Sequence, residues 1–294
     1  MTHIREATNS DIAAIVAFTT DTFEWGDYVP EMIERWIDDD VGVVHVAVDD
    51  SDQPIAVARA VFLTETELWS HAARVHPDHR GRGIAGELAR SLMSWGADNG
   101  GQVVRLMIED DNLASIKHIT KSGFRRSVST VRATRTVGAA SPNPEGNGGR
   151  RTKSSLQARP GKSRDTALVR ASWSTSEVGR FMRELIGVGW SFHRLRDADI
   201  EGAARDGELW EIGGSWAISS GIDPMFSVGL LDTTPDDAYD VIRALIDTAN
   251  NRGAEGLSLW LADTVWLVQA ARRAGCDVSG FGIWEKPIDP HQRP

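Results

Sequence analysis

Residues Val75 to Ala85, which read VHPDHRGRGIA, decide the fold of this chain. They follow an apolar, β-branched stretch typical of a strand and lead into a segment whose apolar residues recur at helical spacing. The first turn of a helix presents unpaired N–H groups at the positive end of the helix dipole, and glycines let an anion approach that backbone closely. Arg80 and Arg82 add positive charge. The stretch therefore predicts a phosphate-binding loop between a strand and a helix.

Two kinds of nucleotide-binding motif are compatible with this loop. Gly81, Gly83 and Gly86 also spell G-x-G-x-x-G, and Glu109 follows at about the distance of a ribose-binding acid. In a dinucleotide-binding fold, however, the first glycine comes directly after the strand, whereas five residues including a proline intervene here. An NAD-dependent enzyme is therefore the more distant alternative.

The loop resembles the signature [RQ]-x-x-G-x-[GA] of the GNAT N-acyltransferases, through Arg80, Gly83 and Ala85. Downstream, residues 112–116 (NLASI) and 121–124 (KSGF) resemble the second signature of that family. The resemblance covers most of residues 3 to 136. Either signature alone would be weak, but the two together are fairly specific.

This resemblance implies the α/β (α+β) acyl-CoA N-acyltransferase fold, in which helices flank a mixed, centrally splayed β-sheet. It implies acetyl-CoA as co-substrate and no metal. The pantetheine arm would lie along the splayed strand edge, the pyrophosphate would bind the loop amides with one arginine as side-chain partner, and an asparagine would sit near the pantetheine. The cofactor-binding residues implied are Ala73, Arg74, Val75, Arg80, Gly81, Arg82, Gly83, Ile84, Ala85 and Asn112.

Direct attack of an amine on a thioester needs a deprotonated amine, a polarised carbonyl and a proton for the thiolate. His71 is the preferred base, because it lies four residues before Val75 on the same expected strand face and resembles a histidine of arylalkylamine acetyltransferases. Glu67 is the second choice. Ile119 replaces the tyrosine that usually protonates the thiolate in this family. His118 points about 100° away from Ile119 on a helix, so we expect it to have a surface or packing role.

The resemblance also places the acceptor between the first two helices and the sheet. There, the connection from Phe23 to Glu31 alternates acidic with aromatic residues. Such a lip would attract an ammonium group and cover it by cation–π contact, so we expect a cationic or aromatic amine. An ordinary polar connection explains the same pattern equally well. The predicted substrate residues are Glu24, Trp25 and Tyr28.

The chain is predicted to hold two copies of this fold in tandem. Residues 1–136 form the catalytic domain, residues 137–165 a flexible linker poor in apolar residues, and residues 166–294 a degenerate second copy. A shift of 152 residues places Gly275 on Gly123, and the strand around Leu257 on the strand around Arg105. A chance similarity of two α/β segments is the alternative.

The second copy lacks the features of the phosphate loop. Its equivalent connection, Asp232 to Asp237, carries three carboxylates at a helix N-terminus and no glycine, so it should repel a pyrophosphate. We therefore expect a structural or substrate-shaping role for this copy. Its tryptophans are expected in the core: Trp210, Trp216, Trp260, Trp266 and Trp284.

Composition limits the class of protein further. The chain has 294 residues, a formal net charge of −10 and one cysteine, Cys276, which excludes an internal disulfide and favours a buried thiol. The charge argues against binding to nucleic acid. The N-terminus lacks the apolar stretch of a signal peptide, and no run is long enough to span a membrane, so we expect a cytoplasmic protein.

The sequence therefore predicts an N-acyltransferase that transfers an acetyl group from acetyl-CoA to a primary amine of a small molecule or peptide. A non-catalytic module that binds acetyl-CoA is the alternative from another class, because the usual tyrosine is absent. The sequence leaves the acceptor, the acyl-chain preference and the oligomeric state open.

Overall fold

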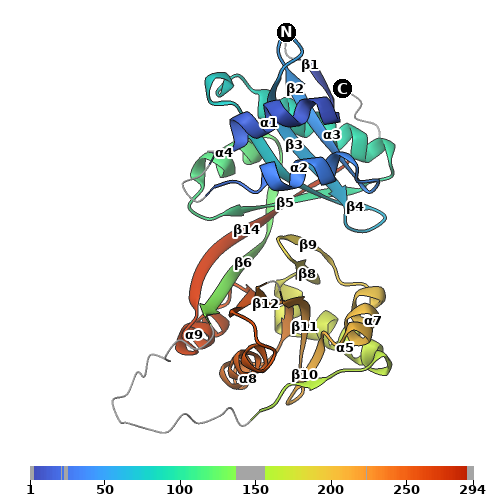
Figure 1. Ribbon diagram of the computed structural model, residues 1–294. Coiled ribbons are helices and arrows are strands. Elements are labelled where there is room, and N and C mark those ends of the chain that lie inside the picture. The colour runs from blue at the N-terminus through green and yellow to red at the C-terminus, as the bar shows by residue number, and fades with distance from the viewer. Residues whose placement is uncertain (1–2, 21, 23–25, 137–155, 223, 290–294) are drawn as a thin grey trace. The chain divides into compact units, whose positions relative to one another are not determined.

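A computed structural model describes residues 3–20, 22, 26–136, 156–222 and 224–289 (Figure 1). Contacts divide the chain into two compact units. Unit one comprises Met1–Met107, Leu113–Arg125 and Trp284–Pro294, and unit two comprises Ile108–Asn112 and Arg126–Ile283.

Unit one is built on a mixed sheet with the strand order β1-β2-β3-β4-β5-β14. Strands β1 to β4 are antiparallel neighbours, whereas β5 runs parallel to β4. The strands are β1 (His3–Glu6), β2 (Gly42–Val48), β3 (Pro54–Phe62), β4 (Glu67–Val75), β5 (Val103–Glu109) and β14 (Asp277–Pro287), the last of which contributes its end from Trp284 to this unit.

Helices cover both faces of this sheet (Figure 1). On one face, Ile15 of α1 and Ile33 of α2 are fully buried against Val46 of β2. Neighbouring strand residues point to opposite faces, and His45 of β2 hydrogen-bonds Ser91 of α3 over 2.9 Å, so α3 covers the other face. The helices are η1 (Asn9–Asp11), α1 (Ile12–Thr19), α2 (Val29–Ile37), η2 (Pro77–His79), α3 (Ile84–Asp98) and α4 (Leu113–Lys121).

β6 from Arg126 onward belongs to unit two, and the end of β14 from Trp284 onward belongs to unit one. β6 (Arg125–Thr136) pairs antiparallel with β13 (Gly256–Ala262) in unit two. The end of β14 lies beside β5 in unit one, where the Lys286 ammonium donates to the Ser122 carbonyl over 2.9 Å. The predicted domain boundary after residue 136 therefore differs from the division by contacts, because the order of elements does not reveal that the final strands are exchanged.

Unit two repeats the element order of the first half with a hairpin and one further helix inserted between its first two sheet strands. Its main sheet has the order β14-β6-β13-β12-β11-β10-β7, and β8 and β9 form a separate two-stranded sheet. The further strands are β7 (Arg159–Pro160), β8 (Leu185–Val188), β9 (Ser191–Arg194), β10 (Leu209–Ile212), β11 (Ser215–Ile222) and β12 (Met225–Asp232). The helices are η3 (Ser163–Asp165), α5 (Thr166–Thr175), α6 (Glu177–Phe181), α7 (Asp197–Asp206), α8 (Ala238–Asn251) and α9 (Val265–Arg273).

The predicted linker is structured at its C-terminal end. Arg159–Pro160 pairs with β10, and Ser163–Asp165 forms a 3-10 turn, because backbone pairing needs no apolar side chain. The earlier part of the predicted linker, residues 137–155, lies outside the described residues.

The internal repeat is visible in local backbone geometry. Gly123 after α4 and Gly275 after α9, which are 152 residues apart, have similar left-handed φ angles of 86° and 83°. Such an angle at a helix C-terminus is the position where glycine is strongly preferred. Among the tryptophans expected in the core, only Trp266 is not buried, since its indole reaches Glu177 at the surface. Cys276 is buried, and burial raises the pKa of its thiol to about 11.

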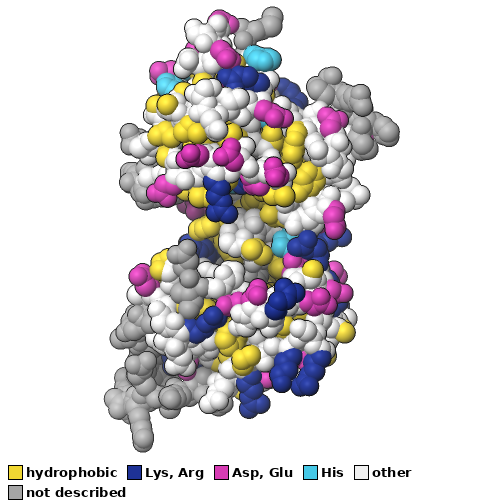
Figure 2. All heavy atoms as spheres, turned by 45° about the vertical axis from the view of Figure 1, so that its right-hand side comes forward, with side chains coloured by type: hydrophobic (Ala, Val, Ile, Leu, Met, Phe, Trp, Pro, Cys, Tyr) yellow, Lys and Arg dark blue, Asp and Glu magenta, His cyan; other side chains and the backbone are white. Residues whose placement is uncertain are grey.

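Acidic and basic side chains lie interspersed over the face of the molecule drawn in Figure 2. Within the residues that the structure describes, no helix is both long enough and apolar enough to cross a membrane.

Candidate functional site

The predicted phosphate loop connects β4 to α3. After the 3-10 turn Pro77–His79, Gly81 and Gly83 adopt φ angles of 77° and 84°. A Cβ atom at either glycine would meet no atom within 4 Å, so backbone conformation rather than packing requires glycine here. The loop backbone is thus open to close approach by a ligand.

The N-terminus of α3 faces this loop with unpaired amides. The first hydrogen bonds of the helix run from the N–H groups of Gly86 and Glu87 to the Gly83 carbonyl, over 2.9 and 3.2 Å. The N–H groups of Ile84 and Ala85 precede these bonds and belong to the helix turn that has no intrahelical acceptor. An anion can satisfy such groups and gains from the helix dipole.

Two arginines stand on the same loop. Arg80 donates from Nε to the Val75 carbonyl over 3.2 Å, and Arg82 donates from Nη2 to the Asp78 carbonyl over 3.0 Å. Both side chains are exposed. A phosphate can replace these neutral acceptors with a charged one, which binds a guanidinium more strongly.

β4 and β5 separate before the loop begins. Their parallel pairing covers three residue pairs and ends at Trp69 and Arg105, while β4 continues to Val75. Ala73 is exposed in the separated part. A strand edge that has left its neighbour offers N–H and C=O groups to an extended ligand. The sheet is therefore splayed at the predicted position.

A β-bulge in the separated part changes which side chains share a face. Val57 of β3 pairs with Arg74 and Arg59 pairs with His71, so two residues of β4 oppose a single residue of β3. Ala72 has a left-handed φ of 57° in this bulge. The expectation that His71 shares its face with Val75 is therefore wrong, because the bulge shifts the alternation and places His71 beside Arg74.

His71 lies in an aromatic and cationic environment. Its ring stacks on Tyr28 at a centroid distance of 6.5 Å and meets Trp36 edge-on at 5.0 Å. Its Nε2 atom is 3.5 Å from Nη1 of Arg59. Burial, followed by the charges of Arg59 and Arg74, lowers the pKa of His71 to about 3. The imidazole is therefore neutral at neutral pH and a weak base in the unliganded protein.

Arg59 is a site residue that the sequence analysis missed. It lies on β3 opposite His71, is 6% exposed, and forms an ion pair with Asp39. Its guanidinium carbon lies 5.1 Å from the ring centre of Trp36. The available signal was a single charged residue inside the apolar strand sequence PIAVARAVF, but the cross-strand contact to His71 depends on pairing that the sequence does not give.

Arg74 is held by Asp27 from the connection between α1 and α2. Arg74 Nε and Nη2 donate to the two oxygens of Asp27 over 2.6 and 3.2 Å, and the Asp27 side chain is completely buried. The guanidinium carbon of Arg74 lies 5.6 Å from the ring centre of Tyr28. Asp27 is thus fully engaged, so this acid of the connection cannot attract an ammonium group as expected.

Of the predicted substrate residues, Tyr28 lies beside the site. Its side chain is 39% exposed and touches Trp36 as well as His71. Glu24 and Trp25 lie outside the described residues.

Glu67, the second candidate base, is engaged in an ion pair away from the loop. It is 8% exposed and forms an ion pair with Arg105 over 3.0 Å, at the end of β4 that still pairs with β5. Arg105 also donates to Glu285 of β14 over 3.2 Å. The three charges link β4, β5 and β14 and argue for a structural role of Glu67.

α4 contributes one side chain to the surroundings of the loop. Ile119, at the position of the usual tyrosine, is buried. The His118 ring, by contrast, approaches the first turn of α3, with Cε1 3.7 Å from where a Cβ of Gly86 would lie. The Asn112 amide donates to the Glu109 carbonyl just before α4, within unit two, and its place near the pantetheine stays a prediction.

In unit two, a hairpin packs on the face of the sheet at the point where β12 and β13 separate. β12 and β13 pair in parallel up to Val228 and Leu259, and Gly229 follows. A Cβ atom on Gly229 would lie only 1.6 Å from the carbonyl oxygen of Gly187 in β8. Both glycines are buried, so the backbones of β8 and β12 are in direct contact at this point.

Trp260 of β13 also holds the hairpin β8–β9 in place. Its indole N–H donates to the Gly189 carbonyl over 2.8 Å, and its ring contacts Phe192 of β9 and Trp190 at the hairpin tip. In the acidic connection to α8, Asp237 occupies the N-cap position without a capping hydrogen bond from its side chain. Unit two thus lacks the basic, glycine-rich loop of unit one.

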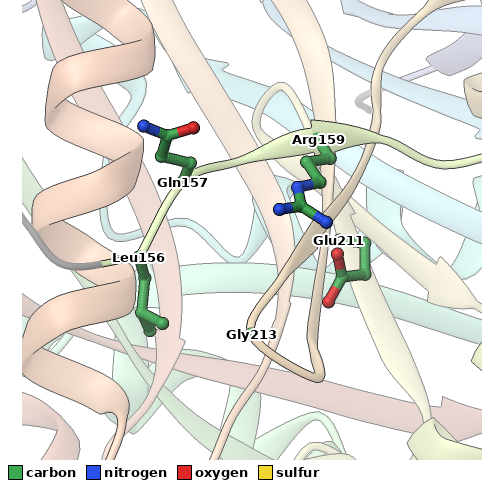
Figure 3. A pocket seen from close by; sticks show the side chains of 5 residues that line it. All are labelled: Leu156, Gln157, Arg159, Glu211 and Gly213. Atoms are coloured by element: carbon green, nitrogen blue, oxygen red, sulfur yellow. The ribbon is translucent and has the colours of Figure 1, made fainter.

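A shallow pocket of about 210 Å³ lies elsewhere on unit two and contains none of the predicted site residues (Figure 3). It is lined by Leu156, Gln157, Arg159, Glu211 and Gly213. Arg159 and Glu211 are cross-strand partners of β7 and β10, and their side chains face each other. The described part of the chain holds no group of three or more side chains suited to a metal ion.

The splayed mixed sheet and the glycine loop at the helix N-terminus define an acyl-CoA N-acyltransferase fold. The sequence profile of the acetyltransferase (GNAT) family matches residues 12–124, which contain the loop and both helices at the acceptor side. Residues 12–124 are therefore similar in sequence to this family of acetyltransferases. The antiparallel strands before the loop also differ from a dinucleotide-binding fold, which opens with the glycine loop.

Solved structures show the same fold over nearly the whole chain. A GCN5-related N-acetyltransferase from Sphaerobacter thermophilus is 16% identical with a TM-score of 0.66, and the match covers 98% of this chain and 96% of that one. A protein assigned as an acetyltransferase from Thermoplasma acidophilum is 17% identical with a TM-score of 0.59, covering 97% and 99%. A comparison with curated proteins finds no match.

Proposed function

We propose that unit one transfers an acetyl group from acetyl-CoA to a primary amine of a small molecule or peptide. The observation that carries this proposal is the separation of β4 from β5 directly before a glycine loop at the N-terminus of α3. The separated edge suits the extended pantetheine arm, and the loop suits the diphosphate.

In this proposal the backbone amides of Arg82 to Ala85 bind the pyrophosphate, with Arg80 as side-chain partner. The backbone of Ala73 to Val75 pairs with the pantetheine arm. The amine nitrogen forms a bond to the thioester carbonyl carbon, and the carbon–sulfur bond breaks. One amine proton leaves to solvent, and the coenzyme thiolate takes up a proton. The acceptor would bind near His71 of β4 and Tyr28, whose rings stack on each other.

A non-catalytic acetyl-CoA-binding module is the second candidate. Buried Ile119 favours it, because this residue cannot protonate a thiolate where the family usually has a tyrosine. A coenzyme thiolate is a good leaving group that water can protonate, so the absence of the tyrosine does not exclude turnover.

The deciding experiment is steady-state release of free thiol from acetyl-CoA with a panel of primary amines. The enzyme proposal expects amine-dependent release and an acetylated amine detected by mass spectrometry. Tight binding of acetyl-CoA without release for any amine would favour the binding module. A thermal-shift comparison of acetyl-CoA with NAD tests the ligand class, because a ligand of the native state raises the melting temperature.

A further inference from the structure

The charges around His71 favour an anionic rather than a cationic ligand group. Burial lowers the pKa of His71 most, and the charges of Arg59 and Arg74 lower it further. The nearby carboxylates of Asp39 and Asp27 are already bound to these two arginines. An ammonium group placed beside His71 would therefore meet two guanidinium groups and no free carboxylate from either of these acids.

Two hydrogen-bond donors at this position are available to a ligand. Arg59 Nε is buried and has no hydrogen-bond partner among the described residues. His71 accepts from Arg59 at Nε2, so its neutral ring carries the proton on Nδ1 and can donate it to a ligand oxygen. A buried donor without a partner, such as Arg59 Nε, costs free energy, and a ligand oxygen nearby can recover it.

The same position is close to the place where the thioester is expected. His71 directly precedes Ala72, the bulge residue in the separated part of β4. Arg59 is its partner on β3, and side chains of such cross-strand pairs are about 5 Å apart at Cβ. If a small molecule binds here through its anionic group, an amine only a few covalent bonds from that group reaches the strand edge where the thioester is expected.

We propose that the acceptor is an amino compound with a carboxylate close to its amine, in the simplest case an α-amino acid. The Nδ1–H group of His71 binds this carboxylate, and Arg59 is a positioning residue that holds the His71 tautomer and, with Arg74, supplies the positive field. This inference rests on the proposed acetyl transfer. It replaces the general-base role expected for His71 with that of a hydrogen-bond donor.

The first test uses the wild-type chain with matched acceptors. Phenylalanine, phenylalaninamide and 2-phenylethylamine form one series, and leucine, leucinamide and 3-methylbutylamine form a second. We expect kcat/KM for the amino acid to exceed that for the amide and the amine by about 10- to 100-fold, as for one charged hydrogen bond. Equal or faster turnover of the uncharged or decarboxylated members in both series would overturn the inference.

A pair of variants separates carboxylate binding from a structural role of the Arg59–Asp39 ion pair. Arg59→Met should reduce the preference for the amino acid to near one, whereas Asp39→Asn breaks the same ion pair and should retain it. Loss of the preference in both variants would assign Arg59 a structural role and overturn its positioning role. Where Arg59→Met does not fold, the wild-type ratio and Arg59→Lys, expected to keep part of the preference, decide the question.

Failure of the two proposals is distinguishable. Turnover without a preference for the carboxylate contradicts this inference alone. Acetyl-CoA binding without turnover of any acceptor, at every amine tested, contradicts acetyl transfer itself and with it the acceptor class.

Discussion

In each unit two parallel strands separate, and the two places differ in the residues around them. Between β4 and β5 of unit one, the edge residue Ala73 is exposed and the following loop is basic and rich in glycine. Between β12 and β13 of unit two, Gly229 touches the backbone of Gly187 in the hairpin β8–β9, and the following loop is acidic.

This comparison shows that one fold can be kept while the loop after the strand changes its chemistry and the sheet is covered at the corresponding point. In unit two the hairpin packs on the sheet over Gly229, and Trp260 holds the hairpin in place. The end of β14 from Trp284 belongs to unit one and completes its sheet. We infer that unit two holds no second acetyl-CoA site.

The largest expected effect comes from removing the part of β14 that completes unit one. A chain ending at Ile283 loses Trp284 and Ile288, both buried, and each such side chain contributes about 1.5–3 kcal/mol. We expect unit one to lose cooperative unfolding and acetyl-CoA binding, although the deletion lies far from the loop in sequence. Retention of both in calorimetry would contradict the exchange of the final strands.

The contact with β8 makes a substitution of Gly229 more destabilising than a substitution of an ordinary glycine. Gly229→Ala should lower the free energy of unfolding by about 3 kcal/mol or more, because the new methyl group meets backbone atoms that cannot rotate away. The matched control is Gly202→Ala within α7, where no atom lies within 4 Å and alanine should stabilise the helix by about 0.5–1 kcal/mol. Urea unfolding measures both, and similar values for the two variants would refute the contact between β8 and β12.

In unit one, a substitution of Gly83 tests whether the loop binds the diphosphate of acetyl-CoA. Gly83→Val forces a β-branched residue to a φ of 84°, which costs about 1–2 kcal/mol, and places methyl groups where the diphosphate is expected. We expect acetyl-CoA affinity to fall at least about tenfold, a loss of the size of one charged hydrogen bond. Gly253→Val is the control, because Gly253 has a φ of 74° and open space in unit two. It should destabilise similarly without changing affinity, and an equal loss of affinity in both variants would count against the loop.

Much of this fold could be predicted from sequence, because local patterns determine its elements. The apolar, β-branched stretch before the loop indicated the strand β4, and the helical spacing of apolar residues after it indicated the helix α3. Features that depend on pairing between distant segments were not predicted. They are the assignment of β6 and the end of β14 to different units, the hairpin that packs over Gly229 and the placement of Arg59 against His71.

The bulge at Ala72 shows the same limit on a smaller scale. One extra residue in β4 reverses the alternation of side chains, and nothing in the stretch SHAARV marks where it falls. The loop, in contrast, was predictable as a strand-to-helix connection because glycine and arginine at a helix start have a direct chemical meaning.

A smaller effect is expected for the arginine of the loop. Arg80→Ala should weaken acetyl-CoA binding by about tenfold, as expected for one charge-assisted hydrogen bond at an exposed site. Arg90→Ala is the matched control, because Arg90 is exposed on α3 beyond its first turn. Titration calorimetry that finds the same affinity for both variants would remove Arg80 from the pyrophosphate site.

The most direct measurement is the stoichiometry of acetyl-CoA binding to the intact chain by isothermal titration calorimetry. The exposed strand edge and glycine loop of unit one, together with the acidic loop of unit two, predict one molecule bound per chain, with affinity at least about tenfold lower in Gly83→Val and unchanged in Gly253→Val. Two molecules per chain, or binding that survives Gly83→Val unchanged, would contradict the assignment of the cofactor to the gap between β4 and β5.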